Sequence, residues 1–168
     1  MRRLRVRLRL RRWWPVGGNG PMDSSVPPAE LCQRQAEWLA PARAALLRRV
    51  SLARRRRVLE VGAGCGAVSA ELARRCEGLV VALDRSAAAL AQGAVERLNH
   101  HRVCGLAERL PLADRSFDLV FFQLALMWMN APLAIAEAVR VLVPDGVLIA
   151  IEPDYGGMIE HPPAIASK

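Results

Sequence analysis

The residues best suited to chemistry lie near the middle of the chain, where glycines and acidic residues fall close together. The stretch Glu60-Val61-Gly62-Ala63-Gly64-Cys65-Gly66 contains a glycine-rich turn, and Asp84 follows it about 20 residues later. Glycines permit a tight turn and a close approach of the backbone to a ligand, and the helix expected after them offers free N–H groups. An acid at the position of Asp84 can accept both hydroxyls of a ribose.

The charge of the glycine-rich turn separates two classes of nucleotide ligand. With Ala67 as its last position, the turn also fits the dinucleotide-binding pattern, and a purely structural turn is a third interpretation. A carboxylate at Glu60 would repel a pyrophosphate, but it suits a ligand with an ammonium group. S-adenosylmethionine (SAM) carries a ribose, a sulfonium and an ammonium, and no phosphate. We therefore expect SAM as the cofactor in preference to NAD.

Short apolar segments alternating with helical ones must position these residues. We expect strands over residues 58–61, 79–83, 101–105, 117–122 and 147–151. We expect helices over 29–50, divided by Pro41, over 67–75, from Ser86 to about Leu98, and over 132–142, closed by Pro144-Asp145-Gly146. Uninterrupted apolar strands between helices predict an α/β fold, a Rossmann-like parallel sheet of about five strands with helices on both faces. In such a sheet, ligands bind beyond the carboxyl ends of the strands.

An ordered set of segments resembles the class I SAM-dependent methyltransferases, and within them the small-molecule group called type 11. The resemblance extends from about Ala29 to Gly157. It rests on Val58 to Gly66, which is similar to motif I, on Val81-Ala82-Leu83-Asp84, and on the segments 107–111, 117–121, 144–148 and 152–157.

The resemblance implies that eight residues bind the cofactor: Glu60, Gly62, Ala63, Gly64, Asp84, Arg85, Ala107 and Gln123. Glu60 would face the methionine end, Asp84 the ribose hydroxyls, and Arg85 the adenine, whose ring the N–H of Ala107 could also reach. Gln123 would lie near the methyl group, or would simply be a polar residue at a strand end. Leu106 departs from the pattern, because members of the family usually have an acid there that accepts a hydrogen bond from the adenine amino group. Leucine cannot accept this bond, which would weaken cofactor binding by on the order of 1 kcal/mol.

No catalytic residue can be named, because methyl transfer mainly requires two molecules to be positioned. Candidates on the acceptor side are Glu152, Asp154, Tyr155 and His161, each equally readable as a loop residue. Trp128, with Met127 and Met129, would either wall an apolar acceptor pocket or pack under the sheet. No metal is expected, because the four cysteines are widely spaced and form no cluster with histidines. They indicate reduced thiols and a cytoplasmic protein.

The formal net charge of +8 is concentrated at the start of the chain. Seven of the 24 basic residues lie in residues 1–21, which contain no acid; the remaining 17 face 16 acidic residues. We expect residues 1–28 to be a disordered arginine-rich tail and residues 29–168 to be the SAM-binding domain. The tail is either an arm that binds nucleic-acid phosphates or sequence upstream of a true start at Met22. No stretch of about 18 apolar residues predicts a membrane span.

The domain is expected to be incomplete at its carboxyl end. The family fold has seven strands, the last two forming an antiparallel hairpin, and only residues 153–168 follow Glu152. The fifth strand would then be an apolar edge open to self-association.

These observations favour transfer of a methyl group from SAM to a small-molecule acceptor. One alternative is a SAM-binding remnant without catalysis, suggested by Leu106 and the short end. Another is an RNA or DNA methyltransferase that uses the basic tail. A dinucleotide-dependent oxidoreductase is a further alternative, which Glu60 disfavours.

Overall fold

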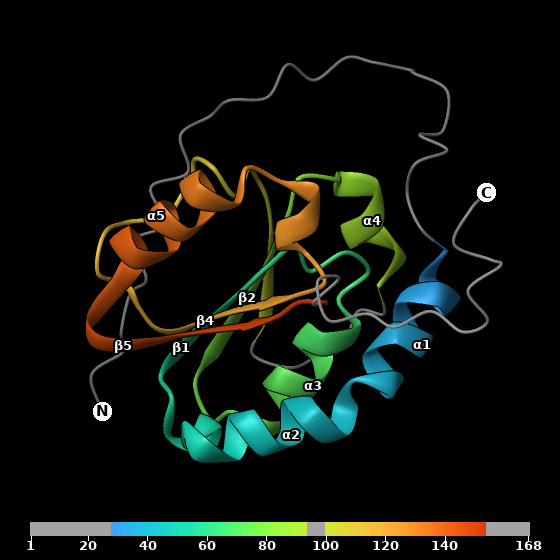
Figure 1. Ribbon diagram of the computed structural model, residues 1–168, viewed down its shortest axis with the longest axis horizontal. Coiled ribbons are helices and arrows are strands. Elements are labelled where there is room, and N and C mark those ends of the chain that lie inside the picture. The colour runs from blue at the N-terminus through green and yellow to red at the C-terminus, as the bar shows by residue number, and fades with distance from the viewer. Residues whose placement is uncertain (1–27, 94–99, 154–168) are drawn as a thin grey trace, which may run out of the picture.

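The computed structural model describes residues 28–93 and 100–153, whose helices and strands alternate along the chain (Figure 1). Asp154, Tyr155, His161 and the predicted tail, apart from Pro28, lie outside these ranges. The elements are α1 (Ala29–Trp38), α2 (Ala40–Arg49), β1 (Arg57–Val61), α3 (Ala67–Arg75), β2 (Leu79–Asp84), α4 (Ala87–Gln92), β3 (His100–Cys104), β4 (Phe117–Gln123), α5 (Ala131–Val141) and β5 (Leu142–Ile151).

The five strands form one parallel sheet in the order β3-β2-β1-β4-β5. At the carboxyl end of β1, Val61 pairs with Leu83 of β2 and with Phe122 of β4. From β1 the chain adds β2 and β3 on one side, and it then crosses to the other side of β1 to add β4 and β5. The direction in which strands are added therefore reverses at β1. This is the place where open α/β sheets bind ligands.

Helices cover both faces of the sheet, as predicted. Figure 1 shows α5 on one face and α1, α2 and α3 on the other. On the α5 face, Ala134, Ala138 and Val141 pack on alternate residues of the central strands. On the opposite face, Leu47 of α2 and Leu72 of α3 pack on the intervening residues of the same strands. The alternation places Glu60 on the face of α2 and α3, because its strand partner Phe121 belongs to that core.

The first helical region is divided as the sequence indicates. Helix α1 ends at Trp38, Leu39 separates the two helices, and Pro41 lies in the first turn of α2. Proline is favoured there because the first N–H groups of a helix have no partner within the helix. The division lets α1 reach the carboxyl end of the sheet while α2 packs beneath it.

Two predicted boundaries are wrong. Helix α4 ends at Gln92, because Gly93 has an extended rather than a helical conformation; residues 94–98 of the predicted helix lie outside the described ranges. Strand β5 begins at Leu142 rather than Val147. The expected turn Pro144-Asp145-Gly146 lies inside the strand, where the pairing register with β4 shifts and Asp145 has a φ of 63°.

Strand β5 lies at one edge of the described sheet. Self-association through this edge stays a prediction. No helix in the described ranges is long and apolar enough to cross a membrane.

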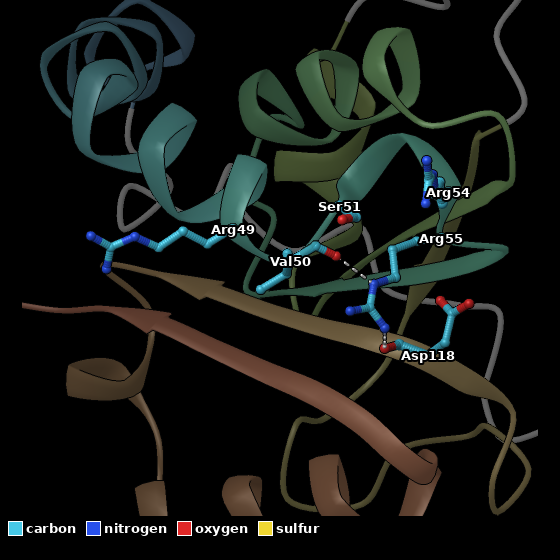
Figure 2. A pocket seen from close by; sticks show the side chains of 6 residues that line it. All are labelled: Arg49, Val50, Ser51, Arg54, Arg55 and Asp118. Atoms are coloured by element: carbon cyan, nitrogen blue, oxygen red, sulfur yellow. Dashed lines mark hydrogen bonds between the residues drawn. The ribbon is translucent and has the colours of Figure 1, made fainter.

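The amino end of the sheet is closed by hydrogen bonds around Asp118 of β4. Its carboxylate accepts the backbone N–H groups of Arg56 and Arg57, at 2.8 and 3.1 Å. The guanidinium of Arg55 donates to the carbonyl oxygens of Val50 and Asp118, as Figure 2 shows. These bonds tie the arginine run before β1 to the start of β4.

A hollow of about 270 Å³ lies at this end. In Figure 2 the side chain of Arg49 points away from those of Arg54 and Arg55, so the three guanidinium groups do not converge on one point.

Candidate functional site

A cavity of about 970 Å³ opens at the carboxyl ends of β1, β2 and β4. A volume of this size is at the upper end of the range for small-molecule sites. All eight residues that the sequence predicts for cofactor binding line it: Glu60, Gly62, Ala63, Gly64, Asp84, Arg85, Ala107 and Gln123. The fold therefore brings together positions that are up to 63 residues apart in the sequence, from Glu60 to Gln123.

The glycine-rich turn is tight, as expected, but the close approach at Gly62 is to the protein itself. Gly62 has a φ of 76°, which side-chain-bearing residues rarely adopt. A Cβ atom built there would lie 2.5 Å from the Cβ of Ala125, in the segment after β4. Gly62 thus makes room for the opposite wall of the cavity, a role that the sequence did not reveal.

Asp84 joins the glycine-rich turn to the loop that follows β2. One carboxylate oxygen accepts the N–H of Gly64 and the other accepts that of Ser86, each at 2.8 Å. Ser86 caps α4 as predicted, accepting the N–H of Ala89. A carboxylate offers about four acceptor positions, so Asp84 keeps about two for a ligand in the cavity.

The backbone N–H groups of the turn are largely engaged within the protein. Those of Gly62 and Ala63 donate to the carbonyl oxygen of Leu83, and that of Gly66 donates to Ala63. With the N–H of Gly64 bonded to Asp84, these groups do not form the cradle that binds a phosphate. This arrangement agrees with the argument against a dinucleotide that rests on Glu60.

Glu60 is a nearly buried acid at the cavity wall, with 3% of its surface exposed. Its Oε2 accepts the hydroxyl of Ser69 on α3. Burial raises the pKa of Glu60 from 4.5 to about 7, because the charged form loses its hydration; the hydroxyl of Ser69 and the charge of Arg43 oppose the rise. A cationic group beside this carboxyl would favour its ionised form.

Arg43 of α2 is a buried cation that the sequence analysis missed. Its guanidinium donates to Glu71 of α3, with Nε 2.9 Å from Oε2, to the carbonyl oxygen of Ala36, and to Oε1 of Gln123 at 2.8 Å. Together these bonds link α1, α2, α3 and the end of β4. Nothing in the local sequence distinguishes Arg43 from the other arginines of the chain.

On the side expected to hold an adenine, the described residues are mostly apolar. Ala107 is buried, Arg85 is exposed, and Leu106 is 56% exposed at the cavity. The exposure of Leu106 means that a side chain at this position can reach a ligand.

The segment after β4 forms an apolar wall of the cavity. Trp128 is 73% exposed and lines the cavity with Met127 and Met129. The structure thus places Trp128 and Met127 at a cavity rather than under the sheet, while Met129 also packs against the core. That this part of the cavity holds the acceptor stays a prediction. A run of apolar residues does not by itself show which side chains face a cavity.

Glu152 supports this wall from behind. Its Oε1 accepts the N–H groups of Ala125 and Leu126, at 2.9 and 3.0 Å. Glu152 is not among the residues that line the cavity. Of its two sequence interpretations, the geometry favours the loop-organising one over contact with the acceptor.

Within the described ranges, no group of three or more acidic, histidine and cysteine side chains is arranged to hold a metal ion.

The sheet is parallel, with helices on both faces, and its cavity lies at the reversal point of the strand order. Glu60 near the end of β1 and Asp84 at the end of β2 line this cavity. These features define a Rossmann-like α/β fold with a candidate ligand site. The family model described as "Methyltransferase domain" matches residues 59–150, more than half of the chain. The protein belongs to this family, which confirms the resemblance to SAM-dependent methyltransferases.

Several relatives share this part of the chain. It is 42% identical over 109 residues to a malonyl-[acyl-carrier protein] O-methyltransferase of Marinomonas sp., covering 61% of this chain and 40% of that protein. It is 42% identical over 105 residues to a demethylmenaquinone methyltransferase of Renibacterium salmoninarum, covering 60% of this chain and 44% of that protein. The chain thus spans less than half the length of these relatives.

Among solved structures, a SAM-dependent methyltransferase from Aquifex aeolicus has the same fold. The TM-score is 0.58 at 22% identity, over 65% of this chain and 62% of that one.

Proposed function

We propose that the cavity binds SAM and that the protein transfers the methyl group to a small-molecule acceptor. The observation that carries the proposal is the convergence of Glu60, Asp84 and Gln123 on one cavity at the reversal point of the sheet. Family membership supports the same activity, and the two relatives above are named for different acceptors.

The residues that line the cavity fit this cofactor. Glu60 supplies a carboxyl group whose ionised form a neighbouring ammonium would stabilise, and Asp84 has acceptor positions left for ribose hydroxyls. The engaged N–H groups of the glycine-rich turn offer little to a phosphate, which SAM lacks.

The cofactor supplies a methyl group activated by a sulfonium. The protein's contribution is then to hold and orient both molecules and to exclude water from the reacting end. Trp128 and Met127 give the acceptor an apolar surface next to the site proposed for the cofactor. Arg85 and the backbone near Ala107 would flank the adenine.

Isothermal titration of SAM against the wild-type chain and Asp84→Ala tests the proposal. We expect the wild type to bind, and Asp84→Ala to bind on the order of 10- to 100-fold more weakly, because a charged acceptor is lost. The matched control is Asp118→Ala at the opposite end of the sheet, which should keep its affinity. A wild-type chain that shows no binding would remove the proposal.

Cofactor binding without catalysis is separated from methyl transfer by a second assay. Transfer from labelled SAM is measured over a panel of metabolites that includes the malonyl-carrier and demethylmenaquinone acceptors named for the relatives. Binding without transfer to any of them would favour the non-catalytic alternative.

The nucleic-acid alternative depends on residues 1–28, of which only Pro28 is described. Absent or salt-insensitive binding of RNA and DNA by the full chain would exclude it. In the described arginine run at the amino end of β1, the guanidinium of Arg55 donates to the carbonyl oxygens of Val50 and Asp118, and that of Arg57 to the carbonyl oxygen of Ser116. The run lies at the end of the sheet opposite the cavity.

A further inference from the structure

The buried guanidinium of Arg43 fixes how the amide of Gln123 is oriented. An arginine can only donate hydrogen bonds, whereas a glutamine amide has one accepting oxygen and one donating nitrogen. Since Arg43 lies 2.8 Å from this amide, it must face the oxygen Oε1. The orientation therefore follows from chemistry and leaves the nitrogen Nε2 as the free group.

The free nitrogen of Gln123 is available to a ligand. Gln123 lines the cavity, and its Nε2 has no hydrogen-bond partner among residues 28–93 and 100–153. Gln123 is half-buried at the wall of the cavity. The next residue, Leu124, has a φ of 52°, a strained conformation that turns the chain sharply after Gln123.

The same guanidinium acts on Glu60. Glu60 and Gln123 lie on neighbouring strands and on the same face of the sheet, the face that α2 and α3 cover. Four groups face the carboxyl of Glu60: Ser69 and Arg43 favour its ionised form, and Asp84 and Glu71 oppose it. Arg43 is the cation among them, and it is only 2% exposed, so water screens its charge little.

We propose that Arg43 is a positioning residue of the cofactor site. It presents the amide N–H groups of Gln123 to a carboxylate oxygen of the cofactor's amino-acid end, and it places a buried positive charge near Glu60, which would face the ammonium group of that end. The inference rests on the proposed function, because it requires the cofactor to occupy this cavity. Arg43 itself would not touch the cofactor. It would determine which atom of Gln123 faces the cofactor, and its charge would act on Glu60.

Titration of S-adenosylhomocysteine between pH 5.5 and 9 tests this role, since this ligand keeps the amino-acid end but lacks the sulfonium charge. Arg43→Gln should bind at least tenfold more weakly at pH 7, and the pH at which binding is half-maximal should rise. Arg43→Lys should recover part of the affinity. The matched control is Arg75→Gln, because Arg75 also pairs with Glu71, at 2.5 Å, but has no bond to Gln123.

A second variant guards against simple loss of folding. Gln123→Glu keeps an acceptor for Arg43 but removes the N–H donor, so it should retain the melting temperature and still bind at least tenfold more weakly. If Arg43→Gln and Gln123→Glu both bind with wild-type affinity and pH dependence, the inference is wrong. A wild type that binds neither SAM nor S-adenosylhomocysteine would instead overturn the proposed function.

Discussion

Asp84 and Asp118 lie at opposite ends of the same sheet and make closely similar bonds. Each carboxylate accepts two backbone N–H groups, those of Gly64 and Ser86 at the carboxyl end and those of Arg56 and Arg57 at the amino end. Both aspartates hold a loop to the end of a strand. Their bonds alone would not show which of them serves a ligand.

The surroundings of the two aspartates differ. Asp84 borders a cavity of about 970 Å³ beside Glu60, whose pKa burial raises to about 7. Asp118 borders a hollow of about 270 Å³, where the neighbouring guanidinium of Arg55 already bonds to two carbonyl oxygens. The comparison teaches that the size of the neighbouring cavity and the buried acid beside it, rather than the bonds of the aspartate itself, distinguish the end proposed to bind a ligand.

The comparison is sharpened first by removing the aspartate at the amino end of the sheet, which should lower the stability of the protein. Asp118→Ala should lower the free energy of unfolding by about 3 kcal/mol, because two N–H groups lose a charged acceptor. Its affinity for SAM should be unchanged. Chemical denaturation and titration calorimetry measure the two quantities. If Asp118→Ala weakens SAM binding as much as Asp84→Ala does, the two ends are not separable in function.

An effect of similar size is expected at the carboxyl end, and it depends on pH. The pKa of Glu60 is raised from 4.5 to about 7, so its contribution to stability is fully present below pH 4.5 and is lost as the pH rises to about 7. Compared with Glu60→Gln, the wild type should lose about 3 kcal/mol between pH 4.5 and 8. Glu60→Gln should therefore be the more stable protein at pH 8, yet bind SAM more weakly.

Denaturation curves at several pH values measure this difference. The control is Glu77→Gln, since Glu77 is exposed and lies outside the cavity. Parallel pH profiles for the wild type and Glu60→Gln would show that Glu60 titrates like an ordinary surface acid.

The smallest effect concerns the adenine side of the cavity. Leu106→Asp places an acceptor at an exposed position of the wall, and should tighten SAM binding by about 1 kcal/mol, or about fivefold. Leu133→Asp, an exposed leucine of α5 away from the cavity, should leave the affinity unchanged. Equal affinity for Leu106→Asp and the wild type would place the adenine amino group elsewhere.

Local patterns in the sequence were enough to predict the sheet and one side of the site. Gly62, Gly64 and Asp84 could be found because a strand, a turn and an acid at fixed spacing reflect a single βαβ unit. The boundaries of α4 and β5 could not, because the extended conformation of Gly93 and the pairing register of β5 depend on the assembled fold.

The other side of the site depends on contacts between residues far apart in the sequence. Arg43 meets Glu71 and Gln123, which lie 28 and 80 positions away, and only the packing of α2 beneath the sheet brings them together. Likewise, whether Trp128 lines a cavity or fills the core depends on where the turn after β4 is held, which Glu152 determines.

The contact between Gly62 and Ala125 has a practical consequence for redesigning this protein. The two positions share one small space, in which an added Cβ at position 62 would lie 2.5 Å from that of Ala125. A library that enlarges the side chain at position 125 while keeping glycine at 62 would push the wall outward and reshape the cavity mouth. Position 62 is therefore best kept as glycine while position 125 is varied.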